Sequence, residues 1–550
     1  MDGPVLHGGL APDGPGNEGD WEKRLRDPRH YGERRAQVQQ LCQELLQGRR
    51  LLVASNRGPL EYFSVPGGEL RARRGRGGAA SALYGIYQAY PVTWVACAMS
   101  DSDREALANA GNNLIRSPLP GQDLLLRFIS PAKDEYHKYY NIVSNPLLWF
   151  LQHMMWNYSW TPNITEATYD AWNRGYTAVN HSFASAVVEE ARREDGPPLI
   201  LLQDYHLYLA PAFIRKEIPA SLIVHFTHVP WPDASHWQLL PRSMREPILR
   251  GLCASDIAGF QTMLSVQNFL HTCHTSLEDA RVDYHRARVD LDGHTTWARR
   301  YPLSVDVAGL RRTLASPQVR SYMEALLPKC GEKNIVRIDR AEPSRNIIRG
   351  FKAFDRLLHR HPELIGKVRF LAFLSSSRNR IWEYQRYCEE VIKLAAFINR
   401  KHGNETWQPV ELVQENNHFQ NLAALSLYDV LLVNPVMDGM SLAAKEGPIA
   451  NTRDGVLVLS EGTGAYEQLR EGALCVCPSD LEGTVQALYQ ALTMPQEERR
   501  RMIEVLRGVV EADDPVLWVY RQLTDAGELA AARAGGAPPG TPPPPEPPSE

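Results

Sequence analysis

Short, mostly apolar runs alternate with longer amphipathic stretches along most of the chain. Seven of these runs have the length of a strand, at 51–54, 199–202, 222–226, 334–338, 368–374, 430–433 and 456–459. Near-continuous apolar strands separated by helical stretches are typical of parallel sheets that helices cover on both faces. The runs form two groups, before and after about residue 306. The pattern therefore predicts an α/β protein with two doubly wound domains and ligands at the carboxyl ends of facing strands.

Helical periodicity is clearest at 346–359, where the apolar positions are Ile347, Ile348, Phe351, Phe354, Leu357 and Leu358. The two ends of the chain lack such patterns. Residues 1–20 are rich in Gly and Pro, and residues 530–550 end in T-P-P-P-P-E-P-P-S-E. We expect a disordered extension at each end, because neither segment can bury a core. The Pro-rich end has an alternative interpretation as a polyproline II ligand.

Composition and charge narrow the class of protein. A chain of 550 residues is too long for one core, and 43% hydrophobic with 23% charged residues is ordinary for a globular protein. A net charge of -4 and a pI of about 6.5 argue against a general nucleic-acid binder. There is no apolar run of 18 residues, and the first residues do not resemble a signal peptide, so we expect no membrane association. The eight scattered Cys lack a C-x-x-C pair, which predicts reduced thiols in a cytoplasmic protein.

The stretch N-P-V-M-D-G-M-S-L-A-A-K-E at 434–446 follows the apolar run 430–433 directly. Asp438-Gly439 predicts a turn, because Gly tolerates positive φ and Asp bonds its own backbone. The residues after it predict the start of a helix, so the amides of Gly439, Met440 and Ser441 are expected to point at a phosphate. Glu446 lies about one helical turn further on, where a carboxylate could accept two ribose hydroxyls. The alternative is a plain surface turn between a strand and a helix.

Basic residues follow the first run of each group. Arg57, in S-N-R-G-P, follows the run 51–54. The stretch R-A-R-R-G-R-G-G at 71–78 has three interpretations: an RGG-type nucleic-acid segment, a solvated basic loop, or a phosphate cradle. Gly77-Gly78 leads into a helical run, which favours the cradle. Arg340 follows the run 334–338 and Arg345 opens the next helix, which together predict an anion clamp, with a solvated basic loop as the alternative.

Polar residues also follow two neighbouring runs of the first group. Asp204, in Q-D-Y-H-L, follows 199–202, and His228, in H-V-P-W-P, follows 222–226. The ends of adjacent parallel strands converge, so both side chains are expected in one crevice, although His228 could equally be a core histidine. The spacing of the nearby His residues fits no common metal-ligand set, and we expect no metal site. The D-S-D sequence at 101–103 precedes a helical run and is better explained by N-capping than by metal binding.

Together these motifs resemble the trehalose-6-phosphate synthase family, whose members are retaining glycosyltransferases of GT-B fold. The resemblance covers about residues 50–525. It rests on S-N-R-G-P, Gly77-Gly78, Y-Y-N-I-V-S-N-P-L-L-W ending at Trp149, Q-D-Y-H-L-Y-L-A-P, H-V-P-W-P, G-F-Q-T at 259–262 and D-G-M-S-L-A-A-K-E. It implies two Rossmann-like domains facing a central cleft: an acceptor domain at 21–305 and a donor domain at 306–529, with the last helix returning to the first domain.

The resemblance also implies the substrates and the roles of the residues that match the family's motifs. It implies transfer of glucose from UDP-glucose or GDP-glucose to glucose 6-phosphate, giving trehalose 6-phosphate and a nucleoside diphosphate, without a cofactor or metal. The acceptor would be held by Arg57, Tyr140, Trp149 and Arg378. Groups acting in catalysis would be Asp204, His228, Arg340 and Arg345. The donor would be held by Gly77, Gly78, Asp438, Gly439, Met440, Ser441, Leu442 and Glu446.

Three positions depart from the family's pattern. Arg345 stands where the family usually has Lys, Ser441 where it has Asn, and Gly447-Pro448 where it has ordinary helix formers. An acidic residue followed shortly by Pro, and S-N-R-G-P in place of the commoner form, are similar to the divergent branch of validoxylamine 7'-phosphate synthases, pseudoglycosyltransferases that join a nucleotide-activated cyclitol to an aminocyclitol phosphate. That activity is the alternative function, and an inactive regulatory homologue is a third hypothesis. The retained Lys445-Glu446 favours ordinary glucosyl transfer. The sequence leaves open the nucleoside of the donor and whether the chain forms a homo-oligomer.

Overall fold

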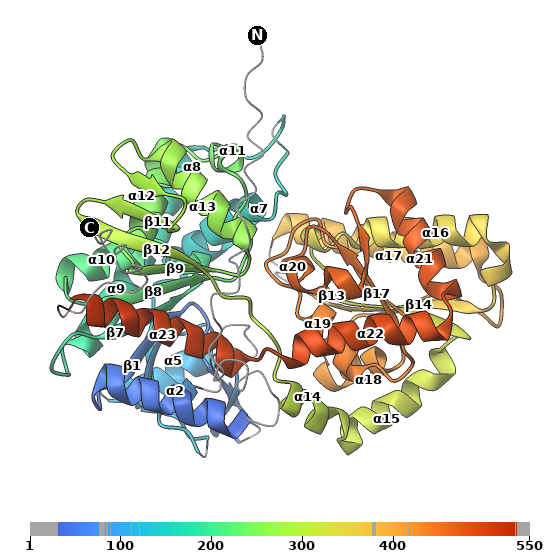
Figure 1. Ribbon diagram of the computed structural model, residues 1–550, viewed down its shortest axis with the longest axis horizontal. Helices are drawn as coiled ribbons and strands as arrows, with labels where there is room; N and C mark the ends of the chain where they lie inside the picture. The colour runs from blue at the N-terminus through green and yellow to red at the C-terminus, as the bar shows by residue number, and fades with distance from the viewer. Residues whose placement is uncertain are drawn as a thin grey trace, which may run out of the picture.

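The computed structural model describes residues 31–533 and 535, except 66, 76–82, 84–85, 88–89, 112, 120, 158, 377–380 and 416. Two separate sheets, each with helices on both faces, form an N-terminal and a C-terminal domain (Figure 1). The seven apolar runs all lie within strands of these sheets, so the predicted α/β class is confirmed.

The N-terminal sheet has ten strands in the order β10-β11-β12-β9-β8-β7-β1-β4-β6-β5. Strands β12 to β6 in that order are parallel, and the strands at the two edges run antiparallel to their neighbours. The strands are β1 (Leu51–Ser55), β4 (Val92–Cys97), β5 (Leu114–Arg116), β6 (Leu124–Ile129), β7 (Leu199–Gln203), β8 (Leu222–Thr227), β9 (Ile257–Phe260), β10 (Arg281–Asp283), β11 (Arg288–Leu291) and β12 (His294–Arg300). A separate hairpin joins β2 (Leu60–Ser64) to β3 (Leu70–Arg74).

The C-terminal sheet has six parallel strands in the order β15-β14-β13-β16-β17-β18. They are β13 (Lys333–Arg340), β14 (Val368–Ser375), β15 (Val410–Val413), β16 (Val430–Val433), β17 (Val456–Ser460) and β18 (Leu474–Val476). In each sheet the order reverses beside the first parallel strand, between β1 and β7 and between β13 and β16. Such a reversal is where doubly wound sheets bind ligands.

Helices cover both faces of each sheet (Figure 1). Those of the N-terminal half are α2 (Tyr31–Leu46), α5 (Asp101–Asn109), α6 (Lys133–His137), α7 (Trp149–Gln152), α8 (Glu166–Ala171), α9 (Ala178–Ala191), α10 (Ala210–Glu217), α11 (Ala234–Trp237), α12 (Arg242–Leu252) and α13 (Met263–Ser276). Those of the C-terminal half are α14 (Val307–Leu314), α15 (Pro317–Leu326), α16 (Ile347–Arg360), α17 (Trp382–His402), α18 (His418–Ser426), α19 (Ala443–Ala450), α20 (Tyr466–Leu469), α21 (Leu481–Thr493), α22 (Gln496–Glu511) and α23 (Pro515–Arg533).

Burial on both sheet faces explains the near-continuous apolar runs. Along β1, Leu52 and Ala54 pack into one core and Leu51 and Val53 into the other. The same alternation occurs on β13 and its neighbours, which separate the two cores of the C-terminal domain. A strand that alternates between two apolar layers has no face on which water favours polar residues.

Two details of the sequence-based expectations are corrected. The helix expected at 346–359 begins at Ile347, because Asn346 has a left-handed backbone, with φ of 58°, and stands outside it. Its side-chain amide donates to the carbonyls of Asn434 and Pro478, which fixes the turn. The N-cap before the D-S-D sequence is Ser100, and Asp103 completes a capping box three residues later.

The last helix, α23, packs on the N-terminal domain although it follows the C-terminal domain in the chain. It lies beside α2 (Figure 1), and Trp518 and Leu523 are buried in the core that contains Val38 and Leu51. The helix continues to Arg533, beyond residue 530, where the sequence suggested a disordered tail.

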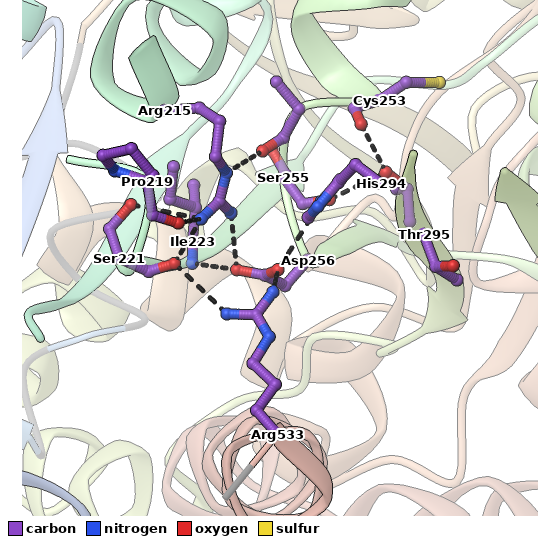
Figure 2. Close-up of polar contacts among 12 residues, drawn as sticks. Arg215, Pro219, Ser221, Ile223, Cys253, Ser255, Asp256, His294, Thr295 and Arg533 are labelled. Atoms are coloured by element: carbon purple, nitrogen blue, oxygen red, sulfur yellow. Dashed lines mark hydrogen bonds and ion pairs between the residues drawn. The ribbon is translucent and has the colours of Figure 1, made fainter. Parts of the chain in front are cut away.

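Arg533, the last residue of α23, binds a buried carboxylate (Figure 2). Asp256, which precedes β9 and is 1% exposed, accepts hydrogen bonds from the guanidinium groups of Arg215 and Arg533 and from the Ile223 amide, and His294 lies 3.5 Å away. This cluster lies at the amino ends of β8 and β9, at the opposite edge of the sheet from their carboxyl ends.

Candidate active site

The residues singled out in the sequence follow five parallel strands that lie on either side of the two reversals in strand order. Arg57 follows β1, Asp204 follows β7 and His228 follows β8. In the C-terminal domain, Arg340 is the last residue of β13, and the stretch 434–446 follows β16. All five segments therefore leave their sheets at the carboxyl edge, as the sequence predicted.

Segments from the two domains meet directly at this edge. A Cβ atom added to Gly439 would lie 1.9 Å from the carbonyl oxygen of His228, and one added to Gly464 would lie 1.7 Å from the carbonyl oxygen of Gly439. The loop after β16 is thus in backbone contact with the loop after β8. Only glycine fits such an approach. The Asp438-Gly439 turn therefore borders the residues expected to hold the sugar.

The conformation of this turn differs from the expected one. We expected Gly439 to take positive φ, but the residue that takes it is Ser441, with φ of 63°. Non-glycine residues rarely adopt this region, and Asn tolerates it better than Ser. The serine is held there by its hydroxyl, which donates to the Asp438 carboxylate. Met440 is buried in the domain core, so its contribution to a ligand is confined to its backbone.

Arg345 is bound to Asp438. It lies in the short turn Pro343–Arg345 before α16, its side chain is 13% exposed, and Nη1 donates to Asp438 Oδ2 at 2.5 Å. Burial opposes the charge on Arg345, but Asp438 and Asp339 outweigh it and raise the pKa of the guanidinium. Burial also favours a neutral Asp438, but Arg345 outweighs it and lowers the pKa of that carboxyl. Both groups are therefore charged at neutral pH.

Arg340 has a different environment from Arg345. Its side chain is 56% exposed, and the nearest carboxylate oxygen, on Glu342, is 3.7 Å away. An exposed guanidinium at a strand end can bind an incoming anion at little desolvation cost. Of the two arginines in the expected clamp, Arg345 is buried and already bound to a carboxylate, whereas Arg340 is exposed.

Asp204 has a strained backbone. Its φ of 75° and ψ of 169° lie in a region that is essentially restricted to glycine and costs about 1–3 kcal/mol for other residues. The strain places Oδ1 3.2 Å from the His228 amide, which donates to it, and Oδ2 4.0 Å from Nδ1 of His206. Strain of this kind is found where function requires the side chain.

His228 is held in place by residues of the N-terminal domain and by the last helix, α23. Its Nε2 lies 3.0 Å from Gln203 Oε1, and its ring packs against Phe226 and against Trp518 of α23. Burial lowers the pKa of His228 to about 3, so the ring is neutral. Gln203 accepts from a neutral Nε2–H, which leaves Nδ1 as the acceptor nitrogen. Gln203 is a contact of the site that was not among the predicted site residues, although it ends β7 and directly precedes Asp204.

The expected acceptor residues lie around a row of stacked rings. Tyr140 stacks on Tyr136 at 5.5 Å and on His206 at 5.9 Å between ring centroids. His206 in turn approaches Asp204, so the row joins the tyrosines to the strained carboxylate. Arg57 is 47% exposed at its side chain and forms an ion pair with Glu61 at 3.2 Å.

Trp149 has a more buried position than we expected for a ligand-binding residue. It is 3% exposed and stacks on His153 at 3.8 Å between ring centroids. Tyr384 of α17 packs against it from the C-terminal domain. Three further expected site residues, Gly77, Gly78 and Arg378, lie outside the described residues.

The helix after the turn, α19, carries one acidic and one basic residue in contrasting environments. The Glu446 carboxylate forms no hydrogen bond or ion pair with any described residue, and burial raises its pKa to about 7. The preceding Lys445 is buried, and its ammonium donates to the carbonyl of Leu303 at 2.6 Å and to Gln468 at 2.7 Å. Burial lowers the pKa of Lys445 to about 8. Lys445 therefore ties the helix to the segment that joins the domains, whereas the Glu446 carboxylate has no polar partner among the described residues.

The unusual Gly447-Pro448 pair is accommodated by packing. A Cβ atom on Gly447 would lie 2.3 Å from a methyl carbon of Leu431, so the glycine lets α19 approach β16 closely. The Pro448 and Asn451 carbonyls accept hydrogen bonds from Arg507 of α22. These bonds give partners to carbonyls at the C-terminal end of α19, where the helix leaves them without amide donors.

No group of three or more His, Cys, Asp or Glu in the described part of the chain is arranged to hold a metal ion. Among the described helices, none combines the length and the apolar character needed to cross a bilayer.

Two Rossmann-like domains whose carboxyl-edge loops meet define the GT-B fold of glycosyltransferases. The profile of glycosyltransferase family 20 matches residues 49–528. The chain belongs to this family and is a trehalose-6-phosphate synthase-like hexosyltransferase, as its sequence motifs predicted.

Relatives of this chain include proteins with two different activities. A bifunctional trehalose-6-phosphate synthase/phosphatase of Thermoproteus tenax is 32% identical over 85% of this chain, which spans only 62% of that relative. A trehalose-6-phosphate synthase of Mycobacterium avium is 30% identical over 88% of this chain and 96% of its own length. A validamine 7-phosphate valienyltransferase of Streptomyces hygroscopicus subsp. jinggangensis is 28% identical over 89% of this chain and 97% of its own length.

A solved structure supports the fold assignment. The E. coli trehalose-6-phosphate protein bound with UDP-2-fluoro glucose aligns with a TM-score of 0.73 and 26% identity, over 87% of this chain and 98% of that one.

Proposed function

We propose that this protein transfers glucose, with retention of configuration, from a nucleotide-glucose to glucose 6-phosphate. The products are trehalose 6-phosphate and a nucleoside diphosphate, and no metal is required. The observation that carries the proposal is the contact between Gly439 and the His228 carbonyl, because it sets the expected donor loop against the residues expected to hold the sugar. The M. avium synthase and the E. coli structure with UDP-2-fluoro glucose support the substrate class.

The donor half of the mechanism follows from the loop after β16. Its backbone amides and the start of α19 would bind the diphosphate, as helix starts do. Glu446 would accept the ribose hydroxyls, since its carboxylate is unpaired among the described residues. Negative charge grows on the leaving diphosphate as the glycosidic bond breaks. Arg340 and Arg345 would stabilise that charge, and such contacts are worth more in the transition state than in the ground state.

The acceptor half follows from the N-terminal domain. Arg57 would bind the phosphate of glucose 6-phosphate, with Tyr140 and Trp149 bordering the sugar. Asp204 would accept sugar hydroxyls, and neutral His228 would contact the transferred glucose through Nδ1. With no carboxylate nucleophile assigned, the acceptor would attack on the face the diphosphate leaves, and the leaving phosphate would take the acceptor's proton.

A screen of donors against acceptors tests the proposal. Purified protein is incubated with UDP-glucose or GDP-glucose and with glucose 6-phosphate, and nucleoside diphosphate release and product mass are measured with and without EDTA. We expect a disaccharide phosphate from at least one donor, unaffected by EDTA, and little product from unphosphorylated glucose. Complete loss with EDTA, or no disaccharide phosphate from any nucleotide-glucose, would refute the proposal.

A second candidate is pseudoglycosyl transfer, in which a nucleotide-cyclitol is coupled to an aminocyclitol phosphate. The specific observation in its favour is the full-length similarity to the validamine 7-phosphate valienyltransferase. Its sequence support is the acidic residue followed shortly by Pro, together with the S-N-R-G-P form at 55–59. A nucleotide-cyclitol with an aminocyclitol phosphate in the same screen distinguishes the two activities, because the products differ in mass and in the atom that joins the rings.

We also propose a cytoplasmic location, consistent with eight cysteines that form no disulfide. Cell fractionation would test it.

A further inference from the structure

Arg337 is a completely buried arginine in the middle of β13. Its side chain is 0% exposed, while its neighbours Ile335 and Val336 pack into the two apolar cores. A buried guanidinium carries a desolvation cost of several kcal/mol unless its partners compensate for it. A smaller apolar residue would suit this strand better, so the contacts of Arg337 are informative.

Those contacts join three segments at the reversal in strand order. Nε donates to Asp339 Oδ2 at 2.7 Å, on the same strand. Nη2 donates to the main-chain carbonyl of Arg345 at 2.5 Å and to Asn434 Oδ1 at 2.8 Å. Arg337 therefore fixes the backbone of Arg345 relative to the first residue after β16. Gly350 of α16 leaves room for it, because a Cβ atom there would lie 2.4 Å from Nη1.

The same residues form an alternating row of buried charges: Arg337, Asp339, Arg345 and Asp438. Asp339 lies between the two arginines, 2.7 Å from Arg337 and 3.9 Å from Nε of Arg345. Arg345 in turn contacts Asp438 at 2.5 Å. With Arg337 present, the two carboxylates are balanced by two guanidinium groups. Without it, both carboxylates would compete for Arg345, the group expected to meet the diphosphate.

We propose that Arg337 is a positioning residue for the diphosphate site. It holds the main chain of Arg345 in place and binds Asp339, so that Asp339 competes less with a bound diphosphate for Arg345, whose close carboxylate partner is Asp438. The location of the diphosphate rests on the proposed function, but the test below does not depend on the acceptor or on turnover.

The measurement is the ratio of the Kd values for a nucleoside monophosphate and its diphosphate, obtained by calorimetry with UMP and UDP and with GMP and GDP. The ratio reports the contacts to the second phosphate. In Arg337→Met we expect it to fall about tenfold, the loss of roughly one charge-assisted contact, with monophosphate affinity within about twofold of wild type. In the double variant Arg337→Met, Asp339→Asn, we expect most of the ratio to return, because the competing carboxylate is gone.

A matched control comes from the same domain. Arg499 of α22 is 9% exposed and also donates to main-chain carbonyls, those of Arg453 at 2.5 Å and Asp454 at 2.9 Å, but it lies beside Asp429 at the amino end of β16. Arg499→Met should lower thermal stability as Arg337→Met does and leave the ratio unchanged. Where Arg337→Met does not fold, Arg337→Lys replaces it. The single ammonium cannot reach all three partners, so its ratio should lie between those of wild type and Arg345→Ala.

An unchanged ratio in a folded Arg337 variant, an equal fall in Arg499→Met, or no recovery in the double variant would overturn the proposal. So would a wild-type protein that binds diphosphate no more tightly than monophosphate. If the ratio behaves as expected and the protein makes no trehalose 6-phosphate, the proposed acceptor is wrong and the role of Arg337 stands.

Discussion

The Asp204→Gly variant should be more stable than the Asp204→Ala variant, although alanine is usually the more stabilising of the two residues. Asp204 has φ of 75° and ψ of 169°, where only glycine is unstrained. Alanine keeps a strain of about 1–3 kcal/mol, and glycine removes it. Glycine costs about 0.5–1 kcal/mol in additional chain entropy. The difference between the two variants is therefore about 0.5–2 kcal/mol in favour of glycine.

Relative to wild type, both variants also lose the hydrogen bond from the His228 amide to Oδ1. That loss is about 1 kcal/mol. Asp204→Gly should thus be near wild type in stability, and Asp204→Ala should be less stable by about 1 kcal/mol. Both should lose almost all turnover, because the strained backbone exists to place a carboxylate that neither variant has.

Urea unfolding followed by circular dichroism measures the order, and nucleoside diphosphate release measures turnover. Asp204→Asn is the control, because it keeps the side chain's shape and the strain. If Asp204→Ala were as stable as Asp204→Gly, the backbone would not be strained at this position. If Asp204→Gly kept substantial turnover, the carboxylate would not be part of the site.

Four further predictions concern other residues. Glu446→Gln should remove a pH dependence of the folding stability. Burial raises the pKa of Glu446 from 4.5 to about 7, so the folded state holds the proton more tightly than the unfolded state does. The stability of wild type therefore falls by up to about 3 kcal/mol as the pH rises from about 4.5 to 7. Urea unfolding across this range should show that fall in wild type and not in the variant, while donor affinity should rise through pH 7 only in wild type. Arg57→Ala should raise the KM for glucose 6-phosphate by about 10- to 150-fold, from a lost contact of about 1.5–3 kcal/mol, and spare donor affinity; equal loss for both substrates would show that Arg57 lies elsewhere. Arg340→Ala should lower kcat by about 10²–10³ and weaken donor binding much less, and a pure rise in donor KM would contradict its role at the leaving group. A chain ending after Arg533 should melt like the full chain, whereas one ending after Leu529 should melt lower because Asp256 loses a partner; equal melting of the two would show that the contact contributes nothing.

The fold was largely predictable because its determinants are local. Each apolar run is buried on both faces, and a fully buried parallel strand leaves that pattern in the sequence whatever its neighbours are. The positions of Asp204, His228 and the 434–446 stretch followed from the same reasoning, since a parallel strand delivers the next residues to its carboxyl edge. A position at the carboxyl edge, however, does not predict which residues each side chain contacts there.

The contacts that were missed join residues far apart in the sequence. Arg345 and Asp438 are 93 positions apart, and the sequence alone placed both beside the donor without pairing them. Arg337 lies inside an apolar run, and no local pattern indicates that its partners include the residue after β16 and the turn before α16. The positive φ of Ser441 was missed for a local reason, since a D-G pair ordinarily places positive φ on the glycine.

Gly439 shows how the second domain can determine a residue that looks like a local turn former. Its own φ is not in the left-handed region, so another residue would suit its backbone. What excludes any side chain is the His228 carbonyl, which a Cβ atom would approach to 1.9 Å. A larger residue would push the loop after β16 away from the loop after β8, and would separate Asp438 and the start of α19 from Asp204. The glycine therefore sets the distance between the two half-sites, and the reaction proposed for them depends on that distance because the transferred sugar has to reach both.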